Sequence, residues 1–356
     1  MKKVVFIINY IVNGGPSRVI YNIAINLVNK FDVTLITLFD KNNKDVIEKF
    51  KKKGIKVKEL NVSKNLRNLI IIDNIVSKEL EKIKPDIVHT HGILPDYINM
   101  KLKLDVKKVS TLHCNVYEDY ILTYGKLKGN IYAKLHIFIL KHIHNVVACS
   151  KYLSDCLKNK IPNITFIRNG ISENLVNKNI TRKDLKIPDD ALIYVYAGNF
   201  TKGKNILNLL RWFKQCNSNN YLLVLGKGPL EDEVKRYESE RIRVLGFKEN
   251  IMEYFNLADI YVSASLSEGF SISILEALDT GLHLLLSNIP SHNEVININK
   301  DIYLGEVFDN NNFKSQIKKL EDKFRKENKS EIISFKNRYL SDINMTNEYI
   351  KVYEEE

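Results

Sequence analysis

The chain is poor in cysteine and has no long apolar run. Its four cysteines form no C-x-x-C pair and have no histidine partners at zinc-finger spacing; they are Cys114, Cys149, Cys156 and Cys216. This pattern indicates neither a disulfide framework nor a structural metal site, and reduced thiols are typical of a cytoplasmic protein. No apolar run approaches the roughly 18 residues that a membrane-spanning helix needs, which argues against an integral membrane protein.

A signal peptide is also not indicated at the start of the chain. The apolar stretch at 4–8 follows Met1, Lys2 and Lys3, but it is short and lacks a small-residue cleavage site after it. We therefore expect these residues to form a first buried strand.

Positive charge is in excess, and it is unevenly distributed. The 356 residues include 54 Lys and Arg against 42 Asp and Glu, a net charge of +12. Residues 1–180 hold 30 basic and 15 acidic side chains, which leaves 24 and 27 for residues 181–356. A codon bias towards lysine would raise lysine throughout the chain and does not explain this division. An anionic partner is therefore expected on the first half.

Short β-branched runs alternate with helical patterns, which predicts parallel sheets covered by helices. We expect an α/β fold of two Rossmann-like, doubly wound domains that face a cleft. Residues 1–170 would form the first domain, 171–335 the second, and 336–356 a C-terminal helix able to pack back on the first. The expected strands lie at 4–8, 33–37, 86–90, 108–112, 145–149, 193–198, 221–226, 242–246, 259–265 and 283–287.

Two loops that follow predicted strands are rich in glycine. The first, at 13–18, contains Gly14 and Gly15 and precedes a helical run, so its backbone amides can approach an anion. Alone, such a loop is more often a simple tight turn. The second, at 226–229, resembles half of a dinucleotide fingerprint, but Glu231 stands where the third glycine belongs.

The strongest motif is a pair of glutamates, Glu268 and Glu276, separated by seven residues. The first would lie just before a helix and the second inside it, with the free amides of 269–271 directed at an anion. A carboxylate in this position suits the paired hydroxyls of a ribose. The alternative is an acid favoured by the helix dipole together with an unrelated surface glutamate.

These motifs, in this order, resemble glycosyltransferase family 4, the retaining nucleotide-sugar transferases of the GT-B fold. The matching segments cover residues 1 to about 295, and the spacing of the glutamate pair from Gly198 and Lys204 is fairly specific. The segments are Gly14-Gly15, Thr111-Leu112-His113, Ser150, Asn169-Gly170, Gly198 to Asn205, Leu225 to Pro229, Leu245-Gly246-Phe247, Ala258-Asp259 and the glutamate pair.

The resemblance implies roles for individual residues. Glu276 would hold the ribose, Glu268 would lie near the diphosphate and the donor sugar, and backbone groups near Phe247 would meet the base. Arg18 and His113 would lie on the acceptor side. The implied catalytic residues are Glu268, Lys204 and His113, and the implied donor-binding residues are Gly14, Gly15, Asn199, Lys204, Gly228, Phe247, Glu268, Gly269, Phe270, Ser271 and Glu276.

One departure from the family concerns the diphosphate. The family places an Arg and a Lys five residues apart to stabilise the charge that develops on the leaving group. This chain keeps Lys204 but has Asn199 in place of the Arg, and asparagine brings no charge. Arg18, Lys202 or the amides of 269–271 are the candidates to compensate.

The function that the resemblance implies is retaining transfer of a hexosyl or N-acetylhexosaminyl unit. The donor would be a UDP-sugar, and the acceptor a glycan or lipid-linked glycan in cell-surface polysaccharide synthesis. The leaving phosphate would help to deprotonate the acceptor, so Glu268 would orient rather than attack. A UDP-sugar 2-epimerase and a non-catalytic partner subunit are the alternatives, and Asn199 is the feature that supports the second.

No cofactor or metal is expected. The sequence has no D-x-D triplet, which argues against the metal-dependent GT-A class. The pairs His89/His91 and His142/His144 lack an evident third ligand.

Two basic segments of the first half are candidates for contact with an anionic partner, Lys49–Lys58 and Lys126–Lys141. In the second, apolar and lysine residues interleave. This segment is either a helix lying on an anionic membrane or a core-packed helix with a solvated lysine face. Because the family holds its acceptor in the first domain, peripheral attachment to the inner face of the cell membrane is expected there. Nucleic acid is not expected, since no aromatic platform or known motif is present.

Overall fold

The computed structural model describes residues 1–173, 180–216, 219–324 and 328–355, and these form two compact units. The first unit comprises Met1–Ser172 and Asp342–Glu356, and the second comprises Glu173–Ser341. The chain thus enters the second unit after Ser172 and returns to the first after Ser341. The C-terminal segment expected at 336–356 is therefore divided between the two units.

The first unit is built on a parallel sheet of seven strands in the order β3-β2-β1-β4-β5-β6-β7. The central strands are buried on both faces, as parallel sheets require; β1 has an apolar run over its buried length, whereas β4 buries polar side chains as well. The strands are β1 (Lys2–Ile8), β2 (Phe31–Thr37), β3 (Lys56–Glu59), β4 (Ile87–His91), β5 (Lys107–Leu112), β6 (Asn145–Ala148) and β7 (Ile164–Phe166). All five strands predicted for this half are confirmed; the edge strands β3 and β7 were not predicted.

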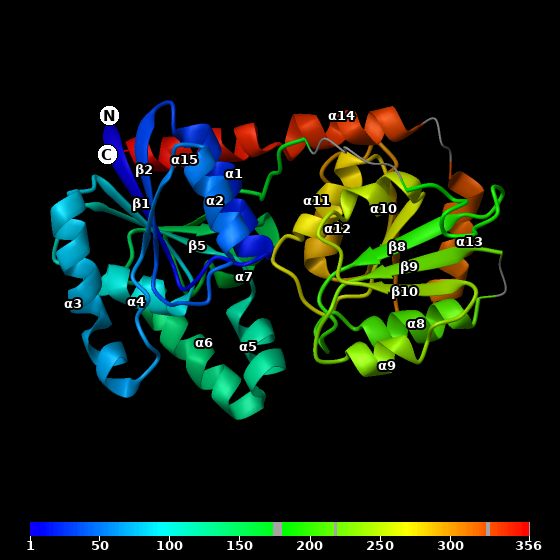
Figure 1. Cartoon of the computed structure of the whole chain (residues 1–356), viewed down its shortest axis with the longest axis horizontal. Helices are drawn as coiled ribbons and strands as arrows, with labels where there is room; N and C mark the ends of the chain where they lie inside the picture. The colour runs from blue at the N-terminus through cyan, green and yellow to red at the C-terminus, as the bar shows by residue number, and fades with distance from the viewer. Residues whose placement is uncertain (174–179, 217–218, 325–327, 356) are drawn as a thin grey trace. The chain divides into compact units, whose positions relative to one another are not determined.

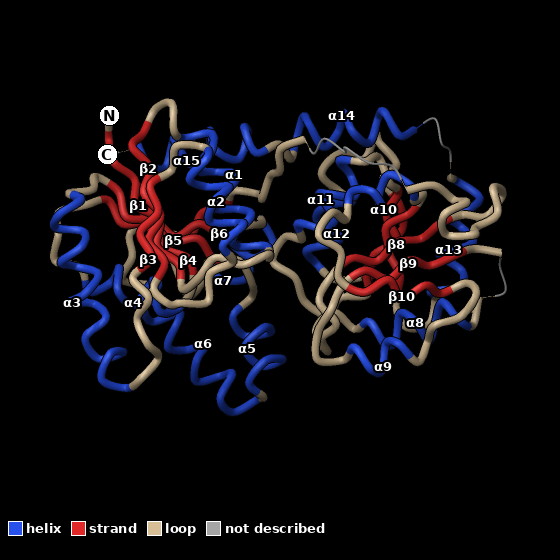
Figure 2. The backbone as a smooth tube through the Cα atoms, in the orientation of Figure 1, coloured by secondary structure: helices blue, strands red, loops and turns tan. Residues whose placement is uncertain are grey.

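Helices cover this sheet, shown as blue coils beside red strands in Figure 2. Side chains from α3 and α4 share one apolar cluster with the central strands. The C-terminal helix α15 packs against α1 (Figure 1). The helices are α1 (Gly15–Leu27), α2 (Lys44–Lys52), α3 (Leu66–Ile83), α4 (Ile93–Lys101), α5 (Val116–Tyr124), α6 (Lys126–Leu140), α7 (Lys151–Leu157) and α15 (Asp342–Glu354).

The second unit has a parallel sheet of six strands in the order β10-β9-β8-β11-β12-β13. The five predicted strands are again present, and the edge strand β13 is an addition. The strands are β8 (Ile193–Ala197), β9 (Tyr221–Leu225), β10 (Ile242–Gly246), β11 (Ile260–Ser263), β12 (His283–Ser287) and β13 (Gly305–Phe308). The fold class predicted from the sequence, two Rossmann-like domains, is therefore confirmed.

Helices of the second unit flank its sheet (Figure 1). Apolar side chains of α8 and α13 pack with the strands in a single core cluster. The helices are α8 (Ile206–Lys214), α9 (Glu231–Lys235), α10 (Met252–Leu257), α11 (Ile272–Asp279), α12 (Pro290–Ile296), α13 (Phe313–Lys323) and α14 (Lys329–Tyr339). Of the helices described, none is long and apolar enough to cross a membrane.

Candidate active site

The strand order of the second unit creates a switch point between β8 and β11. From β8 the chain moves outward to β9 and β10, then crosses back to pair β11 on the other side of β8. Ligands of doubly wound sheets bind where the loops at such a point diverge, beyond the carboxyl ends of the strands. The loop after β8 carries Asn199 and Lys204, and the loop after β11 carries Glu268.

Lys204 and Glu268 meet at this switch point. Nζ of Lys204 and Oε1 of Glu268 form an ion pair, and the two side chains are 31% and 12% exposed. The hydroxyl of Ser265 donates to the same Oε1 at 2.8 Å. The amide of Leu266 donates to the carbonyl of Gly203 at 2.8 Å, which ties the two loops together. The structure therefore brings two of the predicted catalytic residues into direct contact.

The surroundings of Glu268 keep it ionised. Burial alone raises the pKa of this carboxyl, but Lys204 and the hydroxyl of Ser265 outweigh burial, so the pKa lies below its ordinary value. Burial lowers the pKa of the nearby His292 to about 4, against the opposing attraction of Glu268. At neutral pH the site thus holds a carboxylate, an ammonium and a neutral imidazole. It is suited to orienting polar groups and stabilising negative charge.

Residues that the sequence pattern did not single out support this pair. The hydroxyl of Ser287 donates to the carbonyl of Ser265 at 2.6 Å and lies 3.1 Å from Nδ1 of His292. Ser287 ends β12, and His292 lies in the first turn of α12. Polar residues at the carboxyl ends of buried strands would have been the signal for both serines.

Helix α11 begins where the glutamate motif predicts. Glu268 precedes the helix, and Glu276 lies inside it with only 2% of its surface exposed. Ser271 is the residue before the helix, and its side chain makes no capping hydrogen bond. Gly269 and Phe270 lie in the loop before the helix. The first amides of any helix lack partners within the helix, so those of Ile272 and Ser273 are suited to an anion.

Two glycines of the second unit are required by the close approach of neighbouring loops. A Cβ at Gly226 would lie 1.9 Å from the carbonyl oxygen of Gly198, and one at Gly228 would lie 2.6 Å from that of Phe200. The amide of Phe200 also donates to the carbonyl of Lys227 at 2.9 Å. Packing of the protein itself therefore explains Gly228, and its contact with a donor stays a prediction.

Asn199 and Phe247 both lie at the surface of this unit. The carbonyl of Asn199 accepts a hydrogen bond from the hydroxyl of Tyr196 at 3.1 Å, and its side chain is exposed. Phe247 is 46% exposed, and the ammonium of Lys227 lies 4.3 Å from the centre of its ring. An exposed ring beside a cation suits a flat, anionic ligand such as a nucleotide.

In the first unit, the glycine loop after β1 leads into α1. The amide of Arg18 donates to the carbonyl of Gly14 at 3.1 Å, and Gly15 is the first residue of the helix. A Cβ at Gly14 would make only ordinary contact, 3.8 Å from Val12. The protein itself leaves room for a side chain there, so a ligand approaching the backbone is a reason for glycine at this position.

His113 follows β5 and is half-buried. Its Nε2 lies 2.9 Å from Nδ1 of His91, and the two rings stack. Burial lowers the pKa of His113 to about 4 and that of His91 well below its ordinary value. His89, next on the same strand face, lies 2.7 Å from the hydroxyls of both Thr111 and Tyr353. The three imidazoles are therefore neutral at pH 7.

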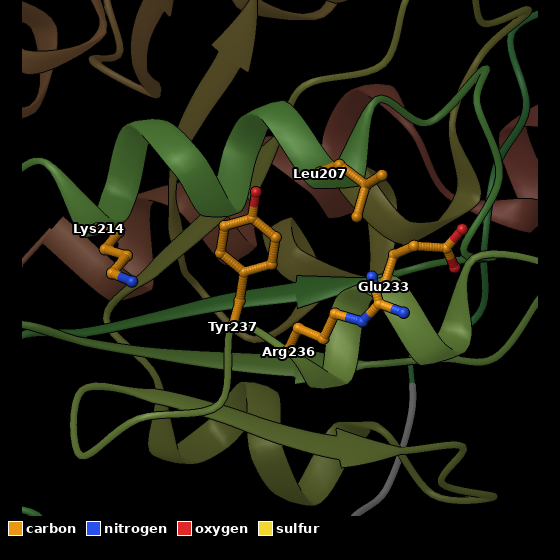
Figure 3. A pocket seen from close by; sticks show the side chains of 5 residues that line it. All are labelled: Leu207, Lys214, Glu233, Arg236 and Tyr237. Atoms are coloured by element: carbon orange, nitrogen blue, oxygen red, sulfur yellow. The ribbon is translucent and has the colours of Figure 1, made fainter.

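A surface hollow of the second unit lies away from these residues, and no metal site is found among the described residues. In the part of the chain that the structure describes, no three His, Cys, Asp or Glu side chains converge as metal ligands. A hollow of about 410 Å³ lies between α8 and α9 and contains none of the predicted site residues (Figure 3). Its lining residues are Leu207, Lys214, Glu233, Arg236 and Tyr237.

Both halves of the chain match known families. Residues 13–175 match the family described as Glycosyltransferase Family 4, and residues 177–338 match Glycosyl transferases group 1. The chain is 28% identical over 306 residues to an Escherichia coli protein named O-antigen biosynthesis glycosyltransferase WclY, covering 81% of this chain and 80% of that one.

A second Escherichia coli relative is named UDP-Gal:alpha-D-GlcNAc-diphosphoundecaprenol alpha-1,3-galactosyltransferase. It is 28% identical over 294 residues, which cover 74% of this chain and 73% of the relative. Among solved structures, Anabaena Alr3699/HepE in complex with UDP and glucose superposes with a TM-score of 0.79 at 13% identity, over 99% of each chain. A likeness at this identity shows a shared fold.

Proposed function

Because this chain belongs to the family 4 glycosyltransferases of the GT-B fold, we propose that it moves a sugar from a UDP-sugar to a lipid-linked glycan, with retention of configuration. The observation that carries the proposal is the Lys204–Glu268 ion pair at the β8/β11 switch point, directly before α11. Negative charge develops on the leaving diphosphate, and a fixed ammonium at that point can stabilise it.

The donor is assigned from the chemistry of the second unit. Lys204 and the first amides of α11 face the diphosphate, and the buried carboxylate of Glu276 accepts hydrogen bonds from the two ribose hydroxyls. We assign the base to the neighbourhood of Phe247, and the exposed ring of this residue supports the assignment. UDP as the nucleotide is supported by the Escherichia coli relative named for UDP-Gal and by the Anabaena structure with UDP.

The acceptor is assigned to the first unit. The named relatives act in O-antigen biosynthesis and on a diphosphoundecaprenol-linked sugar, which supports a lipid-linked glycan in cell-surface polysaccharide synthesis. Arg18 lies in the first turn of α1, the helix that follows β1, and His113 lies directly after β5. A neutral His113 can accept a hydrogen bond from an acceptor hydroxyl at neutral pH without carrying charge.

The proposed chemical step is retaining transfer of the kind that the family is described to carry out, and the ionised state of Glu268 is compatible with it. The bond between the anomeric carbon and the diphosphate oxygen breaks, the acceptor oxygen bonds to the same face, and its proton passes to the leaving phosphate. Glu268 is ionised and engaged by Lys204, so it orients the ammonium and the sugar and does not donate a proton. The reaction as proposed uses no metal and no cofactor.

The test is transfer from a panel of UDP-sugars to a lipid-linked glycan, followed by NMR of the product. We expect one donor to be used and the anomeric configuration of its sugar to be kept. An inverted product would contradict retention. Interconversion of free UDP-sugars without an acceptor would instead identify an epimerase, and UDP binding without turnover on any donor would contradict transfer by this chain.

A further inference from the structure

Helices α5 and α6 of the first unit form a tightly packed hairpin. A Cβ at Gly129 would lie 2.5 Å from the carbonyl oxygen of Tyr120 and 2.6 Å from the backbone of Ile121. Only glycine therefore permits α6 to approach α5 this closely. The two helices are therefore held together by close backbone packing, and this packing leaves the residues on the outer face of the hairpin exposed to solvent.

A buried polar network anchors the inner face of α6. Oδ2 of Asp96 lies 2.8 Å from Nε2 of His136, and both side chains are buried. Nδ1 of His136 lies 2.8 Å from the hydroxyl of Tyr120, and the hydroxyl of Thr90 donates to Asp96 at 2.6 Å. These bonds join α6 to α4, α5 and β4. The rotation of α6 about its own axis is thereby set.

The opposite face of α6 carries an exposed apolar stripe. Leu127, Ile131, Leu135 and Phe138 are 78%, 58%, 47% and 55% exposed. At about 100° per residue, these four positions fall within an arc of roughly 80°. Thirteen large apolar side chains are exposed among the described residues, and seven of them lie at 122–138. On most protein surfaces such side chains are scattered singly, so this concentration is unusual.

Lysines border this stripe on both sides. Lys128 lies beyond one edge, and Lys134 and Lys141 lie beyond the other, all exposed. The sequence has no Asp or Glu anywhere from 120 to 154. No ion pair of these lysines is found in the described part of the chain, so their charge is available to an external anion.

The other basic segment of this unit differs in this respect. There Lys51 pairs with Glu48, Lys56 with Asp32 at 2.7 Å, and Lys58 with Glu79 at 3.3 Å. Much of its charge is thus compensated within the protein. No large exposed apolar side chain lies among its described residues. The two segments have similar lysine content but present different surfaces.

We propose that the outer face of the α5–α6 hairpin binds the surface of an anionic lipid bilayer. The apolar stripe enters the region between headgroups and acyl chains, and the bordering lysines bind lipid phosphates. A symmetric pairing of two such faces would place lysines against lysines, which disfavours a second copy as the occupant. The proposal rests on the proposed function only in that a lipid-linked acceptor lies in the same membrane.

Flotation of the full chain with vesicles tests this without any substrate. We expect binding to vesicles containing phosphatidylglycerol, weakening as salt is raised, and little binding to phosphatidylcholine alone. The triple variant Lys128→Gln, Lys134→Gln, Lys141→Gln should reduce the partition coefficient roughly a hundredfold, at about fivefold per lysine. The matched control Lys49→Gln, Lys52→Gln, Lys53→Gln should change it little.

A second variant, Leu127→Gln with Ile131→Gln, should lower binding to anionic vesicles while leaving the net charge unchanged. Circular dichroism and calorimetric unfolding of each variant check that both units are folded. Because vesicle binding needs neither UDP nor turnover, its result stands apart from that of the transfer assay. Equal loss in the matched control, or no binding at low salt, would overturn the proposal. A dimer in sedimentation that the Leu127/Ile131 variant abolishes would assign the face to a second copy instead.

Discussion

The two units use charge in opposite ways. The first unit, residues 1–172 and 342–356, holds 30 basic and 19 acidic side chains, a net charge of +11, and includes the acid-free segment 120–154. The second unit, residues 173–341, holds 24 basic and 23 acidic side chains, a net charge of +1. The second unit nevertheless holds the Lys204–Glu268 pair, in which a single ammonium is fixed at a sheet switch point by a partly buried carboxylate. Net charge therefore does not locate the donor site. A small, specific anion needs a few positioned groups, and an extended anionic surface needs many unpaired ones.

The largest expected effect is in the second unit. Lys204→Ala removes the ammonium at the switch point, and we expect transfer to fall about 10²–10³-fold because the developing diphosphate charge loses its partner. Steady-state assays at saturating acceptor measure the loss. The control is Lys235→Ala, which breaks the exposed Lys235–Glu231 pair of α9. Equal loss in both variants would contradict a special role for Lys204.

The next-largest expected effect distinguishes recognition of the ribose from recognition of the diphosphate. Glu276→Gln keeps the size of a buried side chain but removes its charge, and we expect UDP to bind about 10–100-fold more weakly. Calorimetric titration of UDP measures this. Inorganic pyrophosphate, which has no ribose, serves as the control ligand. A similar loss of affinity for both ligands would contradict ribose binding by Glu276.

Acidification should affect the first unit more than the second. Burial lowers the pKa of His89 to about 3 and those of His113 and His292 to about 4. Folded imidazoles resist protonation while unfolded ones accept it below about 6.5, so stability is complete above that pH and is lost as pH falls towards 4. For each fully buried histidine, we expect acidification to lower the free energy of unfolding by about 2 kcal/mol.

Calorimetry from pH 7 to 4.5 measures this difference. Among the fully buried histidines whose pKa is lowered, His89 and His91 lie in the first unit and His292 lies in the second. We expect the transition of the first unit to fall further in temperature. His292→Asn should reduce the acid sensitivity of the second transition alone. The prediction would be contradicted if both transition temperatures fell equally and the His292→Asn substitution changed neither.

The smallest expected effect is an increase in catalytic efficiency. Asn199→Arg restores the charge that the family usually places in the loop after β8, and the exposed side chain leaves space for it. We expect kcat/KM for the donor to rise about threefold to tenfold, because one further cation faces the leaving group. Asn199→Gln is the uncharged control. No gain from arginine would indicate that another group, such as Lys202, already serves this purpose.

The sequence predicted the central strands because they are short runs rich in β-branched and other apolar residues. It did not predict β3, β7 and β13, which are short edge strands; β3 is largely exposed and reads as part of a basic segment. Each of these strands pairs with a single neighbour and has only three or four residues, so its local composition carries little signal. The remaining edge strand, β10, has five residues and was predicted.

The site was predictable in its parts and not in its contacts. The residues Lys204 and Glu268 are 64 positions apart, and only the strand order brings their loops together. Ser265 and His292 depend on the same geometry and carry no motif. For α6, the sequence left a core-packed helix and a membrane-facing helix open. The structure shows an apolar inner face and an apolar outer face on the same helix, which one periodicity cannot separate.

The division of labour between the two units is tested most directly by measuring donor and acceptor constants in parallel. The variants are Glu276→Gln in the second unit and the Lys128/Lys134/Lys141→Gln triple in the first, each assayed with the acceptor in anionic vesicles and in detergent. We predict that Glu276→Gln raises KM for the UDP-sugar in both settings. The lysine triple should raise KM for the acceptor in vesicles alone. If the lysine triple altered the donor constant, or if Glu276→Gln altered only the acceptor constant, the account would be contradicted.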